Sequence, residues 1–295
     1  MERITERITE VQWFPGHMTR TKRKMLEAIG KIDVVAELVD ARIPYSSRNP
    51  DLNEMIGNKP RVILLNKSDM ADADQTARWI AHYQKQGIPA IALDCRSGKG
   101  INRFAPVVKE LLKERIASWQ AKGMVGRTIK VMIVGIPNVG KSSFINRISN
   151  GAGAKVEDRP GVTRENRWFT IVNGMEMMDT PGVLWPKFQE PLVAEHLAFT
   201  GAVNDSVVDI QHLAARLAQL LAEEYPEMLC QRYKLKELPD KEGIAVVNQI
   251  GKRRGMLVSG GEIDFERAAI TLLDEFRGGK IGRITLEKCD GKWNR

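Results

Sequence analysis

The sequence predicts an α/β fold with a mostly parallel sheet, followed by a small all-helical C-terminal domain. Short β-branched segments alternate with helical patterns from about residue 33 to residue 178. Such alternation is typical of a parallel sheet with helices on both faces. After about Gly201 the strand signals almost vanish, and apolar residues recur at helical spacing. A composition of 43% hydrophobic and 28% charged residues is ordinary for a folded protein and argues against disorder.

Six segments have the pattern of β-strands. They are residues 33–39, 61–65, 90–93, 129–134, 167–172 and 175–178. The last two flank Asn173-Gly174, a pair typical of a tight hairpin turn, so we expect one antiparallel hairpin at the sheet edge. Helical patterns lie at 19–31, 74–86, 103–122, 207–221, 241–254 and 264–277, with a further helix from Lys141.

These patterns divide the chain into four predicted parts. Residues 1–30 form an N-terminal extension with a basic helix, and residues 31–200 form the α/β domain. Residues 203–284 form the helical domain, and residues 285–295 form a basic tail. The chain has 45 basic and 37 acidic residues, and the resulting net charge of +8 favours a polyanionic partner such as nucleic acid.

The cysteines and the apolar segments exclude several other classes of protein. Cys95, Cys230 and Cys289 lie far apart without a C-x-x-C pair, which argues against a disulfide framework and a zinc site and fits a reducing cytosol. No segment approaches the roughly 20 apolar residues that span a bilayer. We therefore expect a cytoplasmic protein with no membrane partner. Nothing in the sequence demands a dimer, so a monomer is expected.

Residues 135–142 read Gly-Ile-Pro-Asn-Val-Gly-Lys-Ser and match the phosphate-loop pattern G-x-x-x-x-G-K-[ST]. The glycines let backbone N–H groups surround phosphates, and the N-terminus of the following helix adds its positive dipole end. Lys141 is expected to reach the β- and γ-phosphates, and the Ser142 hydroxyl is expected to bind Mg²⁺. The nucleotide-binding residues assigned here are Asn138, Val139, Gly140, Lys141, Ser142 and Ser143.

A second motif identifies the base. Asn66, Lys67, Ser68 and Asp69 follow the predicted strand at 61–65. The Asp69 carboxylate can accept hydrogen bonds from guanine N1–H and N2–H₂, whereas adenine has neither donor and would leave a buried aspartate without a partner. Asn66 is expected to tie the loop down, and the stem of Lys67 to cover the ring. The motif and the phosphate loop together predict binding of GTP and GDP. The alternative, an ATPase, requires that the Asn-Lys-Ser-Asp sequence is there by chance.

Two further segments follow the phosphate loop in the order expected of a nucleotide switch. Residues 179–182 read Asp-Thr-Pro-Gly at the end of a predicted strand. Asp179 is expected to hold a Mg²⁺-bound water, and the Gly182 N–H group is expected to sense the γ-phosphate. Thr163 lies between the phosphate loop and the hairpin, where a switch threonine closes on Mg²⁺ and the γ-phosphate.

The base motif precedes the phosphate motifs, which is the order of a circularly permuted GTPase. Three further segments indicate one family among the permuted GTPases. They are QWFPGHM at 12–18, DARIPYSSRNP at 40–50 and DTPGVLWPKF at 179–188. They closely resemble the ribosome biogenesis GTPase A family within the TRAFAC-class translation-factor-like GTPases, and the likeness runs from about residue 11 to residue 285. It implies a circularly permuted P-loop GTPase domain and action in assembly of the bacterial large ribosomal subunit.

A second loop expected to contact the guanine base, at residues 94–97, departs from the general GTPase pattern. It is called the second base loop. Asp94, Cys95 and Arg96 stand where many relatives have Ser-Ala-Lys. We expect the Cys95 N–H group to meet the guanine O6 oxygen, so the departure concerns the tightness of binding.

The source of the catalytic group is open. Val183 stands where Ras-type proteins place the glutamine that orients the attacking water, so slow intrinsic hydrolysis is expected. His17 either swings toward the γ-phosphate when a partner docks or packs in its aromatic turn. Asn138 either ligates K⁺, as in cation-stimulated relatives, or braces the phosphate loop.

The helical domain carries basic residues but no motif with a readable chemistry. Lys252, Arg253, Arg254, Lys280 and Arg283 either grip RNA phosphates or form a solvated charged face, and the resemblance implies binding of ribosomal RNA there. The permuted order also makes the chain leave the nucleotide domain directly after residues 179–182. The γ-phosphate is therefore expected to reposition residues 203–284.

Two functions of different classes follow from these observations. The first is a slow GTPase that docks on a maturing large subunit in its GTP form and is released when the particle stimulates hydrolysis. The alternative is an RNA-binding assembly scaffold in which nucleotide is only a structural ligand.

Overall fold

The computed structural model describes most of the chain. The described residues are 23, 25–149, 167–171, 174–182, 184–185, 190–238, 240–291 and 293. Their contacts group into two compact units. The sheet unit comprises the described residues up to 185 together with residues 287–293, and the helical unit comprises residues 190–286.

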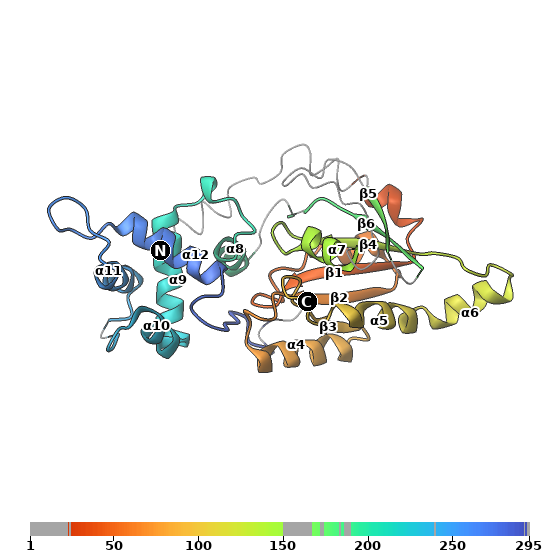
Figure 1. Cartoon of the computed structure of the whole chain (residues 1–295), viewed down its shortest axis with the longest axis horizontal. Coiled ribbons are helices and arrows are strands. Elements are labelled where there is room, and N and C mark those ends of the chain that lie inside the picture. Colours follow the sequence, from red (N-terminus) through yellow and green to blue (C-terminus); the bar gives the residue numbers. More distant parts are fainter. Residues whose placement is uncertain are drawn as a thin grey trace. The chain divides into compact units, whose positions relative to one another are not determined.

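The sheet unit is built on six strands in the spatial order β3-β2-β1-β4-β6-β5 (Figure 1). They are β1 (Val34–Asp40), β2 (Arg61–Asn66), β3 (Ala90–Ala92), β4 (Ile129–Gly135), β5 (Arg167–Ile171) and β6 (Met175–Asp179). All neighbouring pairs are parallel except β5 and β6, which are antiparallel. The predicted mostly parallel sheet with an edge hairpin is therefore confirmed.

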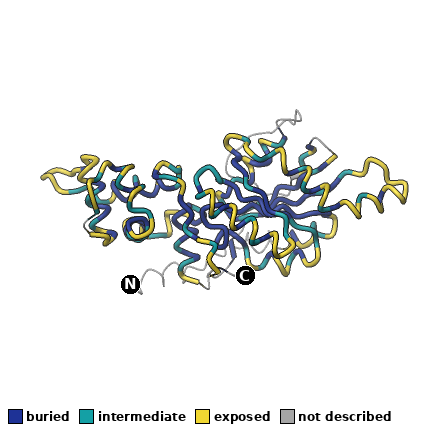
Figure 2. Tube along the Cα trace, turned by 90° about the horizontal axis from the view of Figure 1, so that it is seen from below, coloured by how far each residue is buried: buried dark blue, intermediate teal, exposed yellow. Residues whose placement is uncertain are grey.

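The strand connections create a natural binding edge. From β1 the chain moves to β2 and β3 on one side, and then crosses to β4 on the other side of β1. The carboxyl ends of these parallel strands lie at one edge, and the reversal between β1 and β4 is a topological switch point, where α/β sheets bind ligands. Every residue of β1 is buried, as expected for a central strand covered on both faces. Figure 2 shows these strands as a dark blue centre.

Helices cover the sheet, and most of them follow the predicted patterns. They are α3 (Leu52–Ile56), α4 (Ala73–Lys85), α5 (Phe104–Leu111), α6 (Lys113–Ala121) and α7 (Lys141–Ser149). Helix α4 begins where the Asp72 carboxylate accepts a hydrogen bond from the Gln75 N–H group, at 2.8 Å. The helix predicted over 103–122 is interrupted at Leu112, where α5 ends and α6 begins. The first predicted helix, 19–31, is described in part, and its residues 25–29 are helical.

The helical unit confirms the predicted all-helical C-terminal region. Its helices are α8 (Pro191–Phe199), α9 (Ile210–Glu224), α10 (Pro226–Tyr233), α11 (Gly243–Arg253) and α12 (Phe265–Arg277). Helix α9 is central and packs against the other four. The close approach of α11 depends on Gly243, because a Cβ added there would clash with the Ala215 carbonyl oxygen on α9. Helices α8 and α10 were not predicted as separate elements.

The two units divide the chain at other positions than the sequence pattern suggested. Helix α8 belongs to the helical unit, whose residue Arg277 on α12 donates to the Ala198 and Phe199 carbonyl oxygens at the end of α8. Residues 287–293 belong to the sheet unit, although residues 285–295 were predicted to be a basic tail. Glu287 is fully buried there. In the described parts of the chain, every helix is too short or too polar to cross a bilayer.

Candidate functional site

The polar residues singled out in the sequence gather at the carboxyl edge of the sheet. Asn66 is the last residue of β2, Gly135 of β4 and Asp179 of β6, and Asp94 follows β3 by two residues. Since these strands are parallel, their carboxyl ends share one edge. The structure thus brings the predicted base motifs and phosphate motifs to one side of one sheet.

The phosphate loop has the curled backbone that its sequence predicted. Asn138 has φ 57° and Gly140 has φ +104°, so two residues of the loop leave the usual right-handed region. Such a turn directs successive N–H groups inward, which favours an anion. Asn138, Ser142 and Ser143 are exposed, and α7 starts at Lys141. The exposed hydroxyl and amide groups are therefore accessible to a nucleotide.

The Lys141 side chain is buried within this loop. Its ammonium group donates to the carbonyl oxygens of Gly135, at 3.1 Å, and Ile136, at 2.9 Å. Burial lowers the pKa of Lys141 to about 8, although the negative charge of Asp179 acts in the opposite direction. A phosphate beside this ammonium group would raise its pKa again, so the electrostatics of the loop favour an anionic ligand.

Asn66 connects the base motif to the phosphate loop. Its side-chain amide donates to the Val139 carbonyl oxygen at 2.7 Å, and its side-chain oxygen accepts from the Cys95 N–H group at 3.1 Å. A Cβ at Gly140 would clash with the Asn66 amide nitrogen, so this contact requires glycine. Asn66 thus joins the base motif, the phosphate loop and the second base loop, in line with the expectation that it ties the base-motif loop down.

Asp94 shapes the second base loop through its own backbone neighbours. Its carboxylate accepts from the N–H groups of Arg96, at 2.8 Å, and Ser97, at 3.2 Å. Burial raises the pKa of Asp94, but the hydrogen bonds from Ser97 and Arg96 outweigh burial and leave the pKa lowered. Burial also raises the pKa of the Cys95 thiol to about 12. The Cys95 N–H group, which was expected to meet the guanine O6 oxygen, donates to Asn66 instead. Asp94 is therefore a turn-forming residue.

The base motif itself is held by two ion pairs. Asp69 lies 3.6 Å from the Arg96 guanidinium, and its side chain keeps 27% of its exposure. Lys67 has φ 59°, which is unusual for a residue with a side chain, and its ammonium group lies 3.0 Å from the buried carboxylate of Asp40. The Asp69 carboxylate remains accessible to a base, while Lys67 is anchored from behind.

Sequence reasoning did not assign a role to Asp40 and Arg42. Asp40 ends β1 and accepts from the Arg42 guanidinium at 2.9 and 2.8 Å. Both side chains are almost fully buried. Burial raises the pKa of Asp40, but the charges of Arg42 and Lys67 outweigh burial and hold the pKa well below its usual range. An aspartate at the end of a buried strand, followed two residues later by an arginine, was the signal that could have identified the pair.

The chain after β6 passes close to the phosphate loop. A Cβ at Gly182 would lie 2.8 Å from Pro137 Cα and 2.9 Å from Lys141 Nζ. The Thr180 hydroxyl donates to the Ile133 carbonyl oxygen of β4 at 2.7 Å and fixes the start of this segment. The predicted phosphate-sensing residue thus lies directly against the phosphate loop.

The residues present fit the magnesium ion that a P-loop GTPase uses. Ser142 presents an exposed hydroxyl at the start of α7, and Asp179 presents a carboxylate at the end of β6, the next strand in the sheet after β4. Both supply oxygen, the donor that Mg²⁺ prefers. Three residues named in the sequence prediction, His17, Thr163 and Val183, lie outside the described residues.

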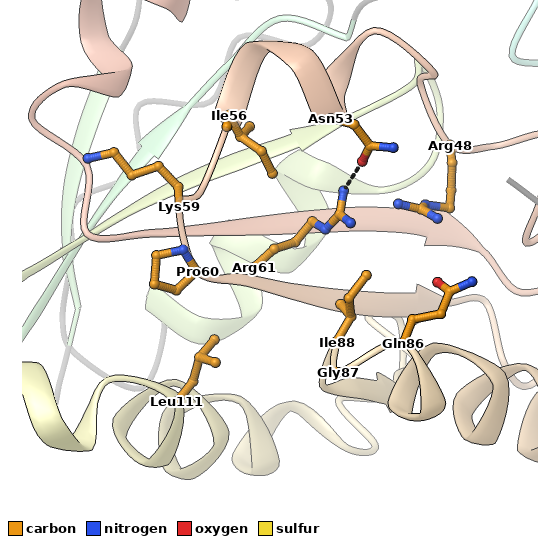
Figure 3. Close-up of a pocket in the computed structure, with 11 residues that line it drawn as sticks. Arg48, Asn53, Ile56, Lys59, Pro60, Arg61, Gln86, Gly87, Ile88 and Leu111 are labelled. Atoms are coloured by element: carbon orange, nitrogen blue, oxygen red, sulfur yellow. Dashed lines mark hydrogen bonds between the residues drawn. The ribbon is translucent and has the colours of Figure 1, made fainter.

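A separate cavity of about 440 Å³ contains several basic side chains but none of the predicted nucleotide residues. Figure 3 shows Arg61 donating to the Asn53 side-chain oxygen, at 2.6 Å. Arg48 and Arg61 also pair with the buried Glu37 carboxylate at 3.2 and 3.6 Å. The charges of Arg48 and Arg61 are therefore used within the fold, and the carboxyl edge of the sheet is the candidate nucleotide site.

Comparisons with known proteins identify the family of the chain. Residues 130–248 match the family model described as a 50S ribosome-binding GTPase. Ribosome biogenesis GTPase A from Bacillus licheniformis is 47% identical over 278 residues, which cover 94% of this chain and 98% of that relative. Mitochondrial ribosome-associated GTPase 1 from Mus musculus is 30% identical, over 94% of this chain and 90% of its own.

A solved structure gives the same result for the fold. GNP-bound YlqF from T. maritima matches with a TM-score of 0.62 and 25% identity, over 92% of this chain and 99% of its own. The prediction of a circularly permuted P-loop GTPase domain followed by a helical region is confirmed.

Proposed function

The chain belongs to the ribosome biogenesis GTPase A family, and from that premise we propose that it docks on the large ribosomal subunit in its GTP form and leaves after hydrolysis. Family membership makes it a GTPase that acts in ribosome assembly. The observation that carries the nucleotide-binding part of the proposal is the double contact of Asn66, which couples the guanine motif to the phosphate loop. A ligand with both a guanine base and phosphates engages both ends of that connection.

On this proposal, Asp69 accepts from the guanine edge, and the loop of Cys95, whose N–H group donates to Asn66, borders the base. Lys141 and the N–H groups of the phosphate loop bind the phosphates, with Mg²⁺ held by Ser142 and Thr163. The positive dipole end of α7 adds to this anion site. Gly182 reports the γ-phosphate because its backbone lies against Pro137 and Lys141.

Hydrolysis requires a group that neither Val183 nor the base motif supplies. We propose that intrinsic hydrolysis is slow and that the ribosomal particle stimulates it. The exposed Asn138 side chain suits a K⁺ ligand, since an additional cation would stabilise charge on the transferred phosphoryl group. His17 remains the proposed group that a docked partner brings to the γ-phosphate.

The helical unit is proposed to contact ribosomal RNA. Lys252 and Arg253 are exposed at the end of α11, and Lys280 and Arg283 are exposed after α12. Arg254 has a different role, because its guanidinium lies 3.2 Å from Glu275 and 5.4 Å from the centre of the Tyr233 ring. Four of the five basic residues named from the sequence therefore support phosphate contacts.

The decisive experiment measures GTP turnover by the purified protein with and without large ribosomal subunits, in KCl and in NaCl. We expect the particles to increase GTP turnover. Faster turnover in KCl than in NaCl would support Asn138 as a ligand of K⁺. No stimulation by mature subunits or by immature intermediates, with GTP still bound, would contradict the proposed switch. Normal assembly by a variant that binds GTP without hydrolysing it would favour the alternative function, a scaffold with a structural nucleotide.

A further inference from the structure

Residues 287–291 and 293 form a strap, as we call it here, that returns to the sheet unit after the helical unit. Glu287 is fully buried, and its carboxylate accepts from the Tyr45 N–H group at 2.6 Å and the Ser46 N–H group at 3.1 Å. The ring of Trp293 lies 5.2 Å from that of Tyr45, centre to centre. The strap therefore holds the turn formed by residues 43–47.

The strap also holds α4, the helix that follows the guanine motif. The Trp79 indole N–H donates to the Glu287 carbonyl oxygen at 2.8 Å, and the Cys289 N–H donates to the Gln75 side chain at 2.9 Å. Trp79 is 1% exposed, so this contact is part of the core. The strap thus joins α4 to the 43–47 turn.

The 43–47 turn in turn holds Asp40. The Ser47 hydroxyl accepts from the Asp40 N–H group at 3.0 Å and donates to the Ile43 carbonyl oxygen at 2.6 Å. The Asp40 carboxylate then pairs with Lys67 at 3.0 Å. Lys67 needs such an anchor, because its left-handed backbone conformation is unfavourable for a residue with a side chain.

We propose that Glu287 is a positioning residue for guanine recognition, acting through the 43–47 turn and Asp40 on Lys67. This proposal rests on the proposed binding of GTP and GDP. It adds Glu287, a residue far from the guanine motif, to the residues that determine base specificity. Fixing Lys67 fixes the loop that carries Asp69, because the Met70 N–H group donates to the Lys67 carbonyl oxygen at 2.9 Å and closes a turn around Asp69. Loosening the strap therefore releases the carboxylate that distinguishes guanine.

The test compares binding of GDP with binding of IDP, whose base lacks the 2-amino group that Asp69 is proposed to recognise. Glu287→Ala is expected to weaken GDP binding about tenfold and to reduce the preference for GDP over IDP. Glu287→Gln keeps one acceptor oxygen and should recover part of both losses. Asp40→Asn, which keeps the side-chain shape, should reproduce the loss of preference.

A double-mutant cycle separates positioning from general stability. If Glu287 acts through Lys67, then Glu287→Ala combined with Lys67→Met should bind GDP about as weakly as Lys67→Met alone. Additive effects of the two substitutions would overturn the proposal. Glu114→Ala removes an exposed carboxylate on α6 and serves as the control, which should bind both nucleotides like the wild type.

The remaining outcomes are also distinct. Circular dichroism would show whether Glu287→Ala is folded, and Glu287→Gln and Asp40→Asn carry the test if it is not. A wild-type protein that binds GDP, together with folded variants that keep the GDP preference, would overturn only this inference. A wild-type protein that binds no guanine nucleotide would overturn the proposed function and this inference together.

Discussion

Gly182 and Lys141 lie so close that a Cβ on Gly182 would come within 2.9 Å of the ammonium nitrogen. The segment after β6 therefore passes against the phosphate loop with room for a backbone and no side chain. Any nucleotide that moves Lys141 also moves the surroundings of Gly182, and this relationship leads to the first prediction.

Gly182→Ala is expected to weaken binding of a GTP analogue by roughly tenfold more than binding of GDP. The added methyl group would press on Pro137 Cα and Lys141 Nζ, and overpacking of this kind costs about 1–3 kcal/mol. Titration with fluorescent nucleotides measures both affinities. Gly30→Ala is the matched control, since a Cβ there has nothing within 4 Å. Equal losses for both nucleotides would show that Gly182 does not distinguish the γ-phosphate.

Asn66→Ala is expected to weaken binding of GDP and GTP alike. The cost is about 1–3 kcal/mol for each buried donor or acceptor that is left without its hydrogen-bond partner. The substitution removes the hydrogen bonds to the Val139 carbonyl oxygen and from the Cys95 N–H group. Calorimetric titration gives both affinities. Asn53→Ala removes a hydrogen bond to Arg61 in the separate cavity and should leave both unchanged. Wild-type affinity in Asn66→Ala would refute the coupling of base loop and phosphate loop.

Nucleotide binding near pH 8 is expected to take up a proton. The pKa of Lys141 falls from its ordinary 10.5 to about 8 in the folded protein, so between these values the unfolded state binds more protons and stability rises with pH. Phosphates favour the charged ammonium and reverse that shift. GDP titrations at pH 8 in buffers of different ionisation enthalpy measure the uptake. Identical heats in all buffers would contradict a titrating Lys141, and Lys141→Arg, which cannot titrate there, provides the comparison.

Gly243→Ala is expected to destabilise the helical unit by about 1–3 kcal/mol, without changing GDP affinity. The new methyl group would clash with the Ala215 carbonyl oxygen, and backbone cannot move aside as a flexible side chain can. Thermal unfolding and a GDP titration test the two halves of the prediction. The neighbouring Ile244→Ala, at a residue 52% exposed, should unfold like the wild type. An unchanged melting temperature for Gly243→Ala would disprove the close approach of α9 and α11.

Lys252→Glu combined with Arg253→Glu is expected to weaken binding to large subunits and to reduce its dependence on salt, because each lost phosphate contact removes about 0.7–0.9 from the slope. Arg254→Ala should mainly lower thermal stability, since Arg254 pairs with the buried Glu275. Sedimentation with subunits over a series of KCl concentrations measures the first effect. An unchanged salt slope in the double variant would remove these two residues from the RNA-binding surface.

The sequence predicted the parts of the fold that have local signatures. The β-branched segments predicted the five strands that pair in parallel, which are β1, β2, β3, β4 and β6. The pair Asn173-Gly174 predicted the hairpin between β5 and β6. Helix α3 was missed because five residues are too few for a helical period. The break at Leu112 was missed because the apolar pattern continues through it.

The site was predictable where a motif encodes its own geometry. The phosphate loop and Asn66 are of this kind, since glycines and strand ends identify them locally. The anchor of Lys67 is not, because its positive φ occurs without a glycine and its partner Asp40 lies on another strand. Glu287 has no local signature at all, and its partners at Tyr45 and Ser46 are more than 240 residues away.

That separation has a consequence during protein synthesis. The 43–47 turn emerges 242 residues before Glu287, an interval on the order of 10–50 seconds at about 5–20 residues per second. Strands β1 and β2 can pair early, whereas the turn beside them waits for a segment that follows the whole helical unit. On the proposed relay, a nascent chain recognises guanine poorly until its helical unit has been translated. Guanine recognition is thereby completed, on this proposal, only after residue 287 has been synthesised.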